Sequence, residues 1–230
     1  MSAPMLSISS GTKKSLKKVL LAELFIVIAL VCIIFIPLNT SSNFDIIFNS
    51  LWTSKLLAVF CLMLHSLLEM FMFTATDRHT LKPVAFLKAC FKGAVLMLIS
   101  VVLFHCIFVL FGAAFFENTA ETFHLALVVG STSVAPAIIH LGTSVDKWLK
   151  VFIFQSSDQC VETMVFYTSV CSVLGVWLGA LPIPLDWDRP WQVWPITCVL
   201  GTVLGHCAGL LLSAIQIACQ ISSTGKYKAT

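Results

Sequence analysis

Six long apolar stretches, separated by short polar segments, dominate the chain. Each has about twenty residues or more, the length that an α-helix needs to cross the hydrocarbon core of a bilayer. The polar segments between them are too short to form a soluble domain. The pattern predicts an all-α fold, a polytopic membrane helical bundle of about six transmembrane helices at residues 19–38, 52–74, 93–116, 121–141, 160–181 and 192–221.

This pattern predicts one membrane domain, residues 19–221, between a basic N-terminus at 1–18 and a short tail at 222–230. The first stretch is too long for the apolar core of a cleaved signal peptide, so we expect a retained anchor. The fourth stretch is the least regular, because small and helix-breaking residues dilute it: Gly130, Ser131, Thr132, Ser133 and Pro136.

Composition and charge agree with a membrane protein of defined orientation. The chain is 58% hydrophobic and 11% charged, whereas soluble domains carry about 25% charged residues. Of its 14 basic residues, only Lys55 and Arg189 fall on one side of the predicted spans. The other twelve fall on the opposite side, and the positive-inside rule therefore predicts that both termini are cytosolic. An even number of spans predicts the same.

The segment between the last two spans has an unusual composition. From Trp177 to Pro195 it holds four of the six tryptophans and four of the eight prolines. Prolines stiffen a loop, and tryptophans favour either a membrane interface or a binding hot spot. The segment is therefore either an interfacial anchor or a preorganised docking element, and we expect docking by Trp177, Pro182, Pro184, Asp186, Trp187, Asp188, Arg189, Pro190, Trp191 and Trp194.

Small residues in the last two spans indicate close helix packing. Glycines four residues apart let two helix backbones approach each other in a membrane. One interpretation is that the two spans pack on each other, and the other is a docking face for a separate membrane protein. The expected packing positions are Gly175, Gly179, Gly201, Gly205 and Gly209.

We single out four ionisable side chains inside the predicted spans. Such groups are costly in lipid and are candidates for function. His65 and Glu69 share one helical face, and His105 and His206 lie on other spans. A proton relay or metal site is one interpretation, and hydrogen bonding between helices is the one we favour. The set lacks a dense carboxylate and imidazole cluster, so we expect no metal, no cofactor and no catalytic residue.

Three smaller features complete the sequence. None of the nine cysteines lies in a predicted loop on the non-cytosolic side, which argues against disulfides. Asn39 begins a glycosylation sequon close to the membrane, where we expect poor occupancy. Lys226 and Lys228 lie five and three places from the C-terminus and resemble the K-x-K-x-x retrieval signal of endoplasmic reticulum membrane proteins.

Three blocks of sequence resemble the PIG-F family, between about residues 85 and 210. The most specific is LGALPIPLDWDRPWQVWP, at residues 178–195, with Gly175 and Trp177 before it and Gly201 after it. The second comprises Phe104-His105, the run Ile107-Phe108-Val109-Leu110, Gly112-Ala113 and Glu121-Thr122-Phe123, and the third is Trp148-Leu149-Lys150-Val151-Phe152.

The resemblance implies a multi-pass endoplasmic reticulum protein of GPI-anchor biosynthesis. Members of the family are understood as non-catalytic partners that stabilise large enzymes with lumenal, metal-dependent catalytic domains. Those enzymes move ethanolamine phosphate from phosphatidylethanolamine to mannoses of the GPI precursor. The expected partners are therefore these catalytic subunits and membrane lipids, and not nucleic acid.

Two other functions compete with this interpretation. The intramembrane His and Glu residues and the irregular fourth stretch favour a small lipid-handling or transporter-like protein, since broken helices often line transport sites. An intramembrane enzyme that uses His105 or His206 is the third possibility, although no nucleophile and base with suitable spacing stand out.

Overall fold

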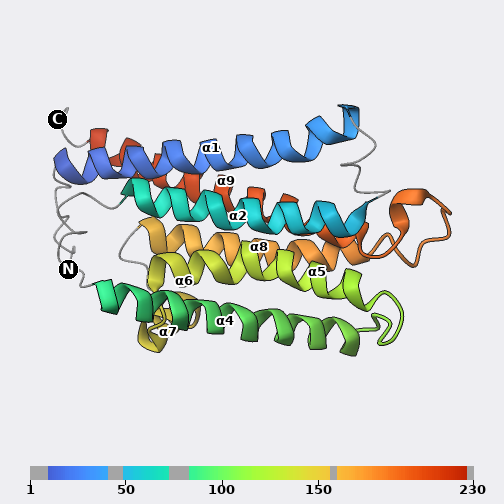
Figure 1. Ribbon diagram of the computed structural model, residues 1–230. Coiled ribbons are helices and arrows are strands. Elements are labelled where there is room, and N and C mark those ends of the chain that lie inside the picture. The colour runs from blue at the N-terminus through green and yellow to red at the C-terminus, as the bar shows by residue number, and fades with distance from the viewer. Residues whose placement is uncertain (1–9, 41–48, 73–82, 156–159, 227–230) are drawn as a thin grey trace.

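Long helices that run side by side make up the described part of the chain (Figure 1). The computed structural model describes residues 10–40, 49–72, 83–155 and 160–226. These residues contain no strand, so the predicted all-α bundle is confirmed. The elements are α1 (Ser10–Thr40), α2 (Ser50–Met72), α4 (Pro83–Leu110), α5 (Thr119–Val129), the π-helix η2 (Gly130–Val134), α6 (Ala135–Leu141), α7 (Val145–Phe152), α8 (Cys160–Ala180), the 3-10 helix η3 (Pro190–Gln192) and α9 (Ile196–Lys226).

Five helical segments of the described chain are long and apolar enough to cross a membrane. They are Ser50–Leu68, Val84–Leu110, Thr119–Leu141, Cys160–Ala180 and Ile196–Cys219. The first predicted span, 19–38, lies inside α1. The structure therefore supports a helical membrane protein, while the total number of crossings stays a prediction.

Several helix ends differ from the bounds of the predicted spans. α1 begins at Ser10 and α9 continues to Lys226, so helix extends into both segments that we expected to be cytosolic tails. The third span was expected at 93–116, but α4 begins at Pro83 and includes Lys88 and Lys92. Lysine is a good helix former, so a helix can continue where the hydropathy falls.

The C-terminus of α4 and the N-terminus of α9 show why these helices differ from the prediction. Gly112 adopts a φ of 108°, and Ala113 donates its N–H to the Phe108 carbonyl over 2.9 Å, which closes α4 six residues before the predicted end. α9 begins four residues after its predicted start, because η3 and Pro195 precede it.

The fourth span is one continuous helix with a π-helical segment in its middle. α5, η2 and α6 follow one another without a break, and η2 holds Gly130, Ser131, Thr132 and Ser133. A π-helical turn widens the backbone and is often found at functional sites. The irregular composition therefore marks a bulge within the helix, and not an end of it.

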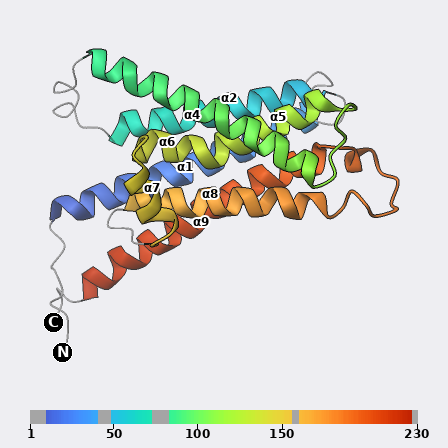
Figure 2. The same ribbon diagram turned by 90° about the horizontal axis from the view of Figure 1, so that it is seen from below.

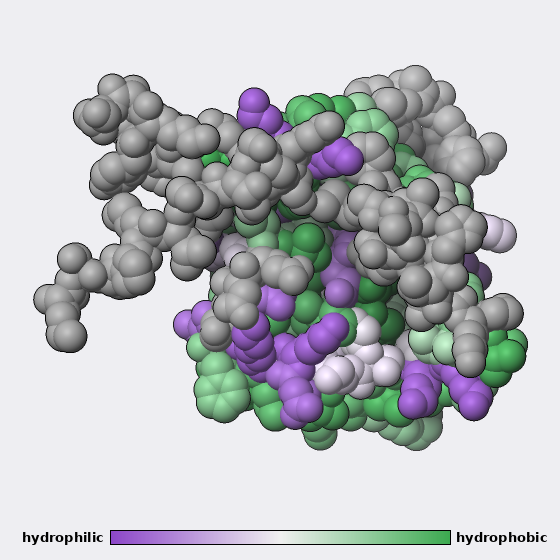
Figure 3. All heavy atoms as spheres, turned by 90° about the vertical axis from the view of Figure 1, so that its left-hand side faces the viewer, coloured by the Kyte–Doolittle hydropathy of each residue, from purple (hydrophilic) through white to green (hydrophobic). Residues whose placement is uncertain are grey.

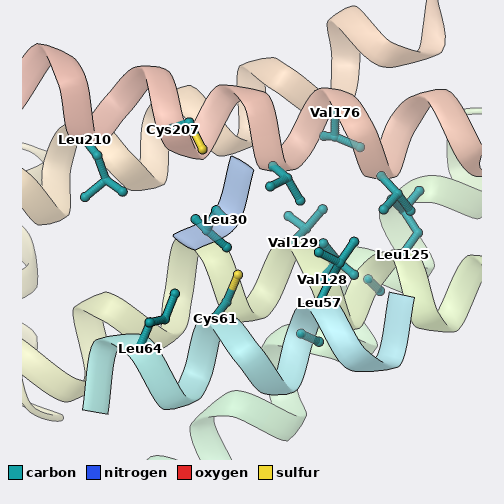
Figure 4. Close-up of a cluster of buried hydrophobic side chains, with 14 of the residues drawn as sticks. Leu30, Leu57, Cys61, Leu64, Leu125, Val128, Val129, Val176, Cys207 and Leu210 are labelled. Carbon is teal, nitrogen blue, oxygen red and sulfur yellow. The ribbon is translucent and has the colours of Figure 1, made fainter. Parts of the chain in front are cut away.

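The apolar core lies between the long helices. Side chains of α1, α2, α5, α8 and α9 converge there, as Figure 4 shows, and Leu30, Leu57, Leu125 and Leu210 are at most 1% exposed. α4 lies on the outside of the bundle (Figure 2). Most of its apolar side chains are exposed. Lipid contact is the expected environment for such a face.

The two ends of the bundle differ in what they carry. The first turn of α1, the last turn of α9 and α7 lie at one end, whereas the segment between α8 and α9 lies at the other (Figures 1 and 2). Figure 3 views the first of these ends, where hydrophilic side chains gather among the described residues. The start of α1 and the end of α9 therefore lie at the same end of the bundle, as an even number of crossings requires.

The predicted orientation can be tested with glycosylation tags. A tag appended after Thr230 should stay unmodified, because the basic residues hold this end in the cytosol. A tag inserted after Glu117, between α4 and α5, should be glycosylated in microsomes. A shift in gel mobility that endoglycosidase removes reports glycosylation of either tag. Glycosylation of the C-terminal tag would show that the predicted topology is wrong.

Candidate functional site

A compact loop at residues 181–195 joins α8 to α9 and is organised by a single amide side chain. Gln192 is 8% exposed, and its Nε2 donates to the carbonyls of Pro182 over 2.8 Å and Leu185 over 2.7 Å. Its Oε1 accepts from the Arg189 N–H over 2.9 Å. These bonds tie the two limbs of the loop together, so the loop has a defined shape before it meets any partner.

Five polar and proline residues of this loop face outward. Pro184, Asp186, Asp188, Arg189 and Pro190 are all exposed. Asp188 has a φ of 48°, a left-handed conformation that aspartate and asparagine tolerate better than most residues. Pro190 begins η3, where it needs no backbone N–H, and the Trp194–Pro195 peptide bond is cis.

The four tryptophans of the loop and its flank have different surroundings. Trp194 is half-buried, and its Nε1 donates to Thr122 Oγ1 of α5 over 3.0 Å. Trp177 packs edge-on against Phe111, with ring centroids 4.3 Å apart. Trp187 is 56% exposed, and its ring centroid lies 5.9 Å from that of half-buried Trp191. The rings of Trp187 and Trp191 therefore lie side by side at the exposed tip of the loop, and Trp194 tethers the loop to the bundle.

The glycines of the last two spans lie where α8 and α9 touch. These two helices form the most extensive helix pair in the bundle. A Cβ on Gly209 would lie 2.6 Å from the Tyr167 carbonyl oxygen, and one on Gly201 would lie 3.0 Å from the Cα of Gly179. Cβ atoms on Gly175, Gly179 and Gly205 would also meet backbone of the opposite helix. Each glycine is therefore covered by the backbone of the other helix of the pair, in line with the intramolecular interpretation of the glycine pattern.

A chain of buried polar side chains crosses the interior. His65 of α2 and His206 of α9 are both fully buried, and their Nε2 atoms lie 3.0 Å apart. His206 Nδ1 lies 3.2 Å from Ser172 Oγ of α8. α6 brings a third imidazole, since the ring centroid of His140 lies 5.9 Å from that of His65.

The donors and acceptors of these side chains determine the direction of each hydrogen bond between them. The Ser172 hydroxyl has one hydrogen, which it donates to the Thr168 carbonyl over 2.6 Å. We infer that His206 then donates from Nδ1 to Ser172 and accepts at Nε2 from His65. His65 Nδ1 is left as a buried acceptor with no partner in the described residues. Two neutral imidazoles satisfy this arrangement, as a low-dielectric interior requires.

The π-helical segment contributes backbone acceptors beside these side chains. Ser169 Oγ of α8 donates to the Ser133 carbonyl over 2.6 Å, and Ser172 Oγ lies 3.4 Å from the Thr132 carbonyl. A π-bulge frees carbonyl groups from the regular helical ladder. η2 therefore bonds to α8 through its backbone and holds the polar chain at the centre of the bundle.

The four polar residues singled out in the sequence do not form one site. His65 and His206 meet, but His105 of α4 lies apart from them, half-buried, with its ring 6.2 Å from that of Phe123. The side chain of Glu69 lies outside the described residues, as do Lys228 and the side chains of Asn39 and Lys226.

Sequence reasoning missed a second buried pair. Glu23 of α1 and Ser213 of α9 are fully buried, and Ser213 Oγ donates to Glu23 Oε1 over 2.7 Å. A lone carboxylate in an otherwise apolar span was the available signal. His140 and Gln192 were missed too, and nothing in their immediate sequence marks them.

The clustered histidines do not make up a metal site in the described part of the chain. No group of three or more His, Cys, Asp or Glu side chains there has a geometry suited to a metal ion. Cys61, Cys198 and Cys207 are buried free thiols of the interior. The polar groups that do converge bond to one another, which is a structural use of them.

The family model and the relatives that match this chain indicate one family of proteins. The family model of the GPI biosynthesis protein family Pig-F matches residues 13–214. A Homo sapiens protein named GPI ethanolamine phosphate transferase, stabilizing subunit, is 36% identical over 206 residues, 88% of this chain and 92% of that protein. A Mus musculus protein of the same name is 44% identical over 126 residues, 55% of this chain and 58% of that protein.

A fungal relative extends the comparison. Glycosylphosphatidylinositol anchor biosynthesis protein 11 of Yarrowia lipolytica is 38% identical over 144 residues, which are 62% of this chain and 61% of that protein. No solved structure matches the chain.

Proposed function

Because this chain belongs to the GPI biosynthesis protein family Pig-F, we propose that it is the non-catalytic membrane subunit that binds and stabilises GPI ethanolamine phosphate transferases. The catalytic subunits of these enzymes would move ethanolamine phosphate from phosphatidylethanolamine to mannoses of the GPI precursor. The observation that carries the proposal is the likeness to the human stabilizing subunit over 88% of this chain and 92% of that protein.

The interior of the bundle supports an accessory role. His65, His206 and Ser172 bond to one another, and Glu23 bonds to Ser213, so these groups connect helices. A preorganised contact surface also favours binding to a partner, because a rigid surface loses little entropy on binding. The loop at 181–195 has such a surface.

We propose that this loop docks on the catalytic subunit through its exposed tip. Trp187 is the anchor, with Trp191 beside it, and Asp186, Asp188 and Arg189 are placed to pair with polar groups of the partner. Tryptophan and arginine are enriched at binding hot spots. Pro182, Pro184 and Pro190 stiffen the loop. Trp194 ties it to Thr122 of α5, and Trp177 of α8 packs against Phe111.

The docking proposal predicts a loss of the partner without loss of the chain. Trp187→Ala should reduce recovery of the transferase on gentle detergent co-purification at least tenfold, because a hot-spot truncation costs about 2 kcal/mol or more. Asp188→Asn keeps the left-handed backbone and removes only the charge. Quantitative immunoblotting of partner and chain gives the ratio.

A matched control separates docking from membrane anchoring. Trp52 is 64% exposed in the first turn of α2, at the same end of the bundle as the loop. Trp52→Ala removes an exposed tryptophan there and should leave recovery unchanged. If the Trp187 and Asp188 variants recover as much transferase as the unchanged chain, and ethanolamine phosphate transfer is normal, the loop is a membrane anchor and not a docking element.

A lipid-handling or transporter-like function is the second candidate. The π-helical segment η2 and the buried polar chain beside it favour this function, because irregular backbone inside a membrane protein often lines a site. The two functions differ in what a variant of the polar chain does. A histidine variant that assembles normally but abolishes transfer would favour the second function.

We further propose residence in the endoplasmic reticulum membrane, aided by Lys226 and Lys228. Replacing both lysines with serine should increase escape to the Golgi when the chain is expressed without its partner, because retrieval signals are read as addresses. Acquisition of Golgi-type glycans on the tag inserted after Glu117, between α4 and α5, measures the escape. An unchanged distribution would mean that the helices or the partner retain the chain.

A further inference from the structure

The segment between the fourth and fifth spans forms a short helix with three distinct faces. α7 (Val145–Phe152) faces the bundle with Trp148, Val151 and Phe152. Val151 is 2% exposed, and the Phe152 ring lies 6.2 Å from that of Phe166 in α8. Trp148 Nε1 donates to the Gly142 carbonyl over 2.8 Å, which folds α7 back onto the end of α6.

The second face is apolar and uncovered. With 3.6 residues per turn, Val145, Leu149 and Ile153 follow one another along one side of the helix. They are 70%, 42% and 68% exposed, and Phe154, the next residue, is 72% exposed. The third face carries Asp146, Lys147 and Lys150. α7 therefore has one face against the bundle, one exposed apolar face and one exposed charged face, and each face requires a different environment.

The position of α7 specifies what those surroundings are. The fourth span ends at Leu141 and the fifth begins at Cys160, so both ends of this segment are at the membrane boundary. The three residues 142–144 that lead into α7 reach at most about 11 Å. In Figures 1 and 2, α7 runs across the long axis of the spanning helices.

We propose that α7, with Ile153 and Phe154, is an interfacial membrane helix that lies flat among the phospholipid headgroups. Val145, Leu149 and Ile153 enter the acyl boundary, and Lys147 is at the level of the phosphates. Amphipathic helices of this kind carry apolar and aromatic residues on one side and lysines on the other. The proposal is independent of the transferase and of the docking loop.

Photoreactive lipids test the proposal on the unmodified chain. The chain is reconstituted into phosphatidylcholine vesicles that contain a phospholipid with a diazirine either beside the acyl carbonyl or at the end of the acyl chain. An interfacial helix is buried about 5–10 Å deep. Peptide mass spectrometry should therefore find adducts in residues 145–154 with the carbonyl-proximal lipid, and a loss of them with the chain-end lipid.

A spanning segment provides the internal control. Leu98, near the middle of α4, is 61% exposed and should react with the chain-end lipid instead. Chain-end adducts in residues 145–154 would place α7 inside the hydrocarbon core, and no adduct with either lipid would place it in water. Either result would overturn the proposal.

Site-specific crosslinking in native membranes tests for a protein occupant. Phe154→p-benzoylphenylalanine keeps an aromatic side chain, and Leu149→p-benzoylphenylalanine probes the middle of the exposed face. Both should yield adducts with clickable phospholipid, whereas Lys147→p-benzoylphenylalanine should lose them. Capture of another polypeptide, or of a second copy of this chain, at 149 and 154 would show that α7 is a protein interface.

Discussion

Gly205→Leu should prevent the chain from accumulating in a folded form. A Cβ at this position meets the Cys171 carbonyl group, with its carbon at 3.0 Å, and lies 3.1 Å from the Cα of Gly175. Overpacking costs about 1–3 kcal/mol when neighbouring side chains can move. Here the neighbours are backbone atoms of α8, so we expect at least about 3 kcal/mol. Fluorescence-detected size exclusion after heating in detergent measures the folded fraction.

The adjacent residue is the matched control for this substitution. Leu204 precedes Gly205 on α9 and is 54% exposed. Leu204→Ala should change stability by about 0.5 kcal/mol or less, as surface substitutions usually do. Gly205→Ala should fall between the two. If Gly205→Leu accumulates and melts like the unchanged chain, the close contact of α8 and α9 at these glycines is wrong.

His206→Leu should destabilise the bundle. The double variant, with His65→Leu as well, should lose less free energy of unfolding than the sum of the losses in the two single variants. Removing His206 leaves the His65 Nε2 without its partner and removes the neighbour of Ser172. Leaving a buried polar group unsatisfied costs about 1–3 kcal/mol. Replacing both histidines removes the unpaired partner too, and groups in one network couple by about 0.5–3 kcal/mol.

Melting in detergent and assembly in membranes provide the readouts for this cycle. His105→Leu is the control, because His105 is half-buried on α4 and lies apart from the chain of bonded histidines. Its effect should be smaller than that of His206→Leu. Strict additivity of the His65 and His206 effects would show that the two imidazoles do not depend on each other. Normal assembly with abolished transfer would contradict the structural role.

The sequence by itself determined the class of fold and the place of the loop. Spans at 52–74 and 160–181 were predicted to within two residues of the helix ends, because about twenty contiguous apolar residues have few alternatives in a bilayer. The segment from Trp177 to Pro195 was recognised from its own prolines and tryptophans, and the structure places its loop at residues 181–195. These are local properties, and a chain that enters a membrane is sorted by local hydropathy and charge.

Helix ends depended on interactions that a hydropathy average does not contain. α4 extends to Pro83 although Lys88 and Lys92 lower the hydropathy of its start, and it ends at the backbone turn of Gly112. The amphipathic α7 was expected as a loop, since its 8 residues are too few for a spanning pattern. Stems of lysine side chains and single backbone angles decide such boundaries.

Only the tertiary structure decided which polar groups meet and which aromatic rings are free. His65 and His206 are 141 residues apart, and Ser213 and Glu23 are 190 apart. Trp194 bonds to Thr122, 72 residues away, while Trp187, in the same loop, stays exposed. Periodicity assigns a residue to a face of its own helix, but helix packing brings two faces together, and so long-range partners follow from the packing and not from spacing along the chain.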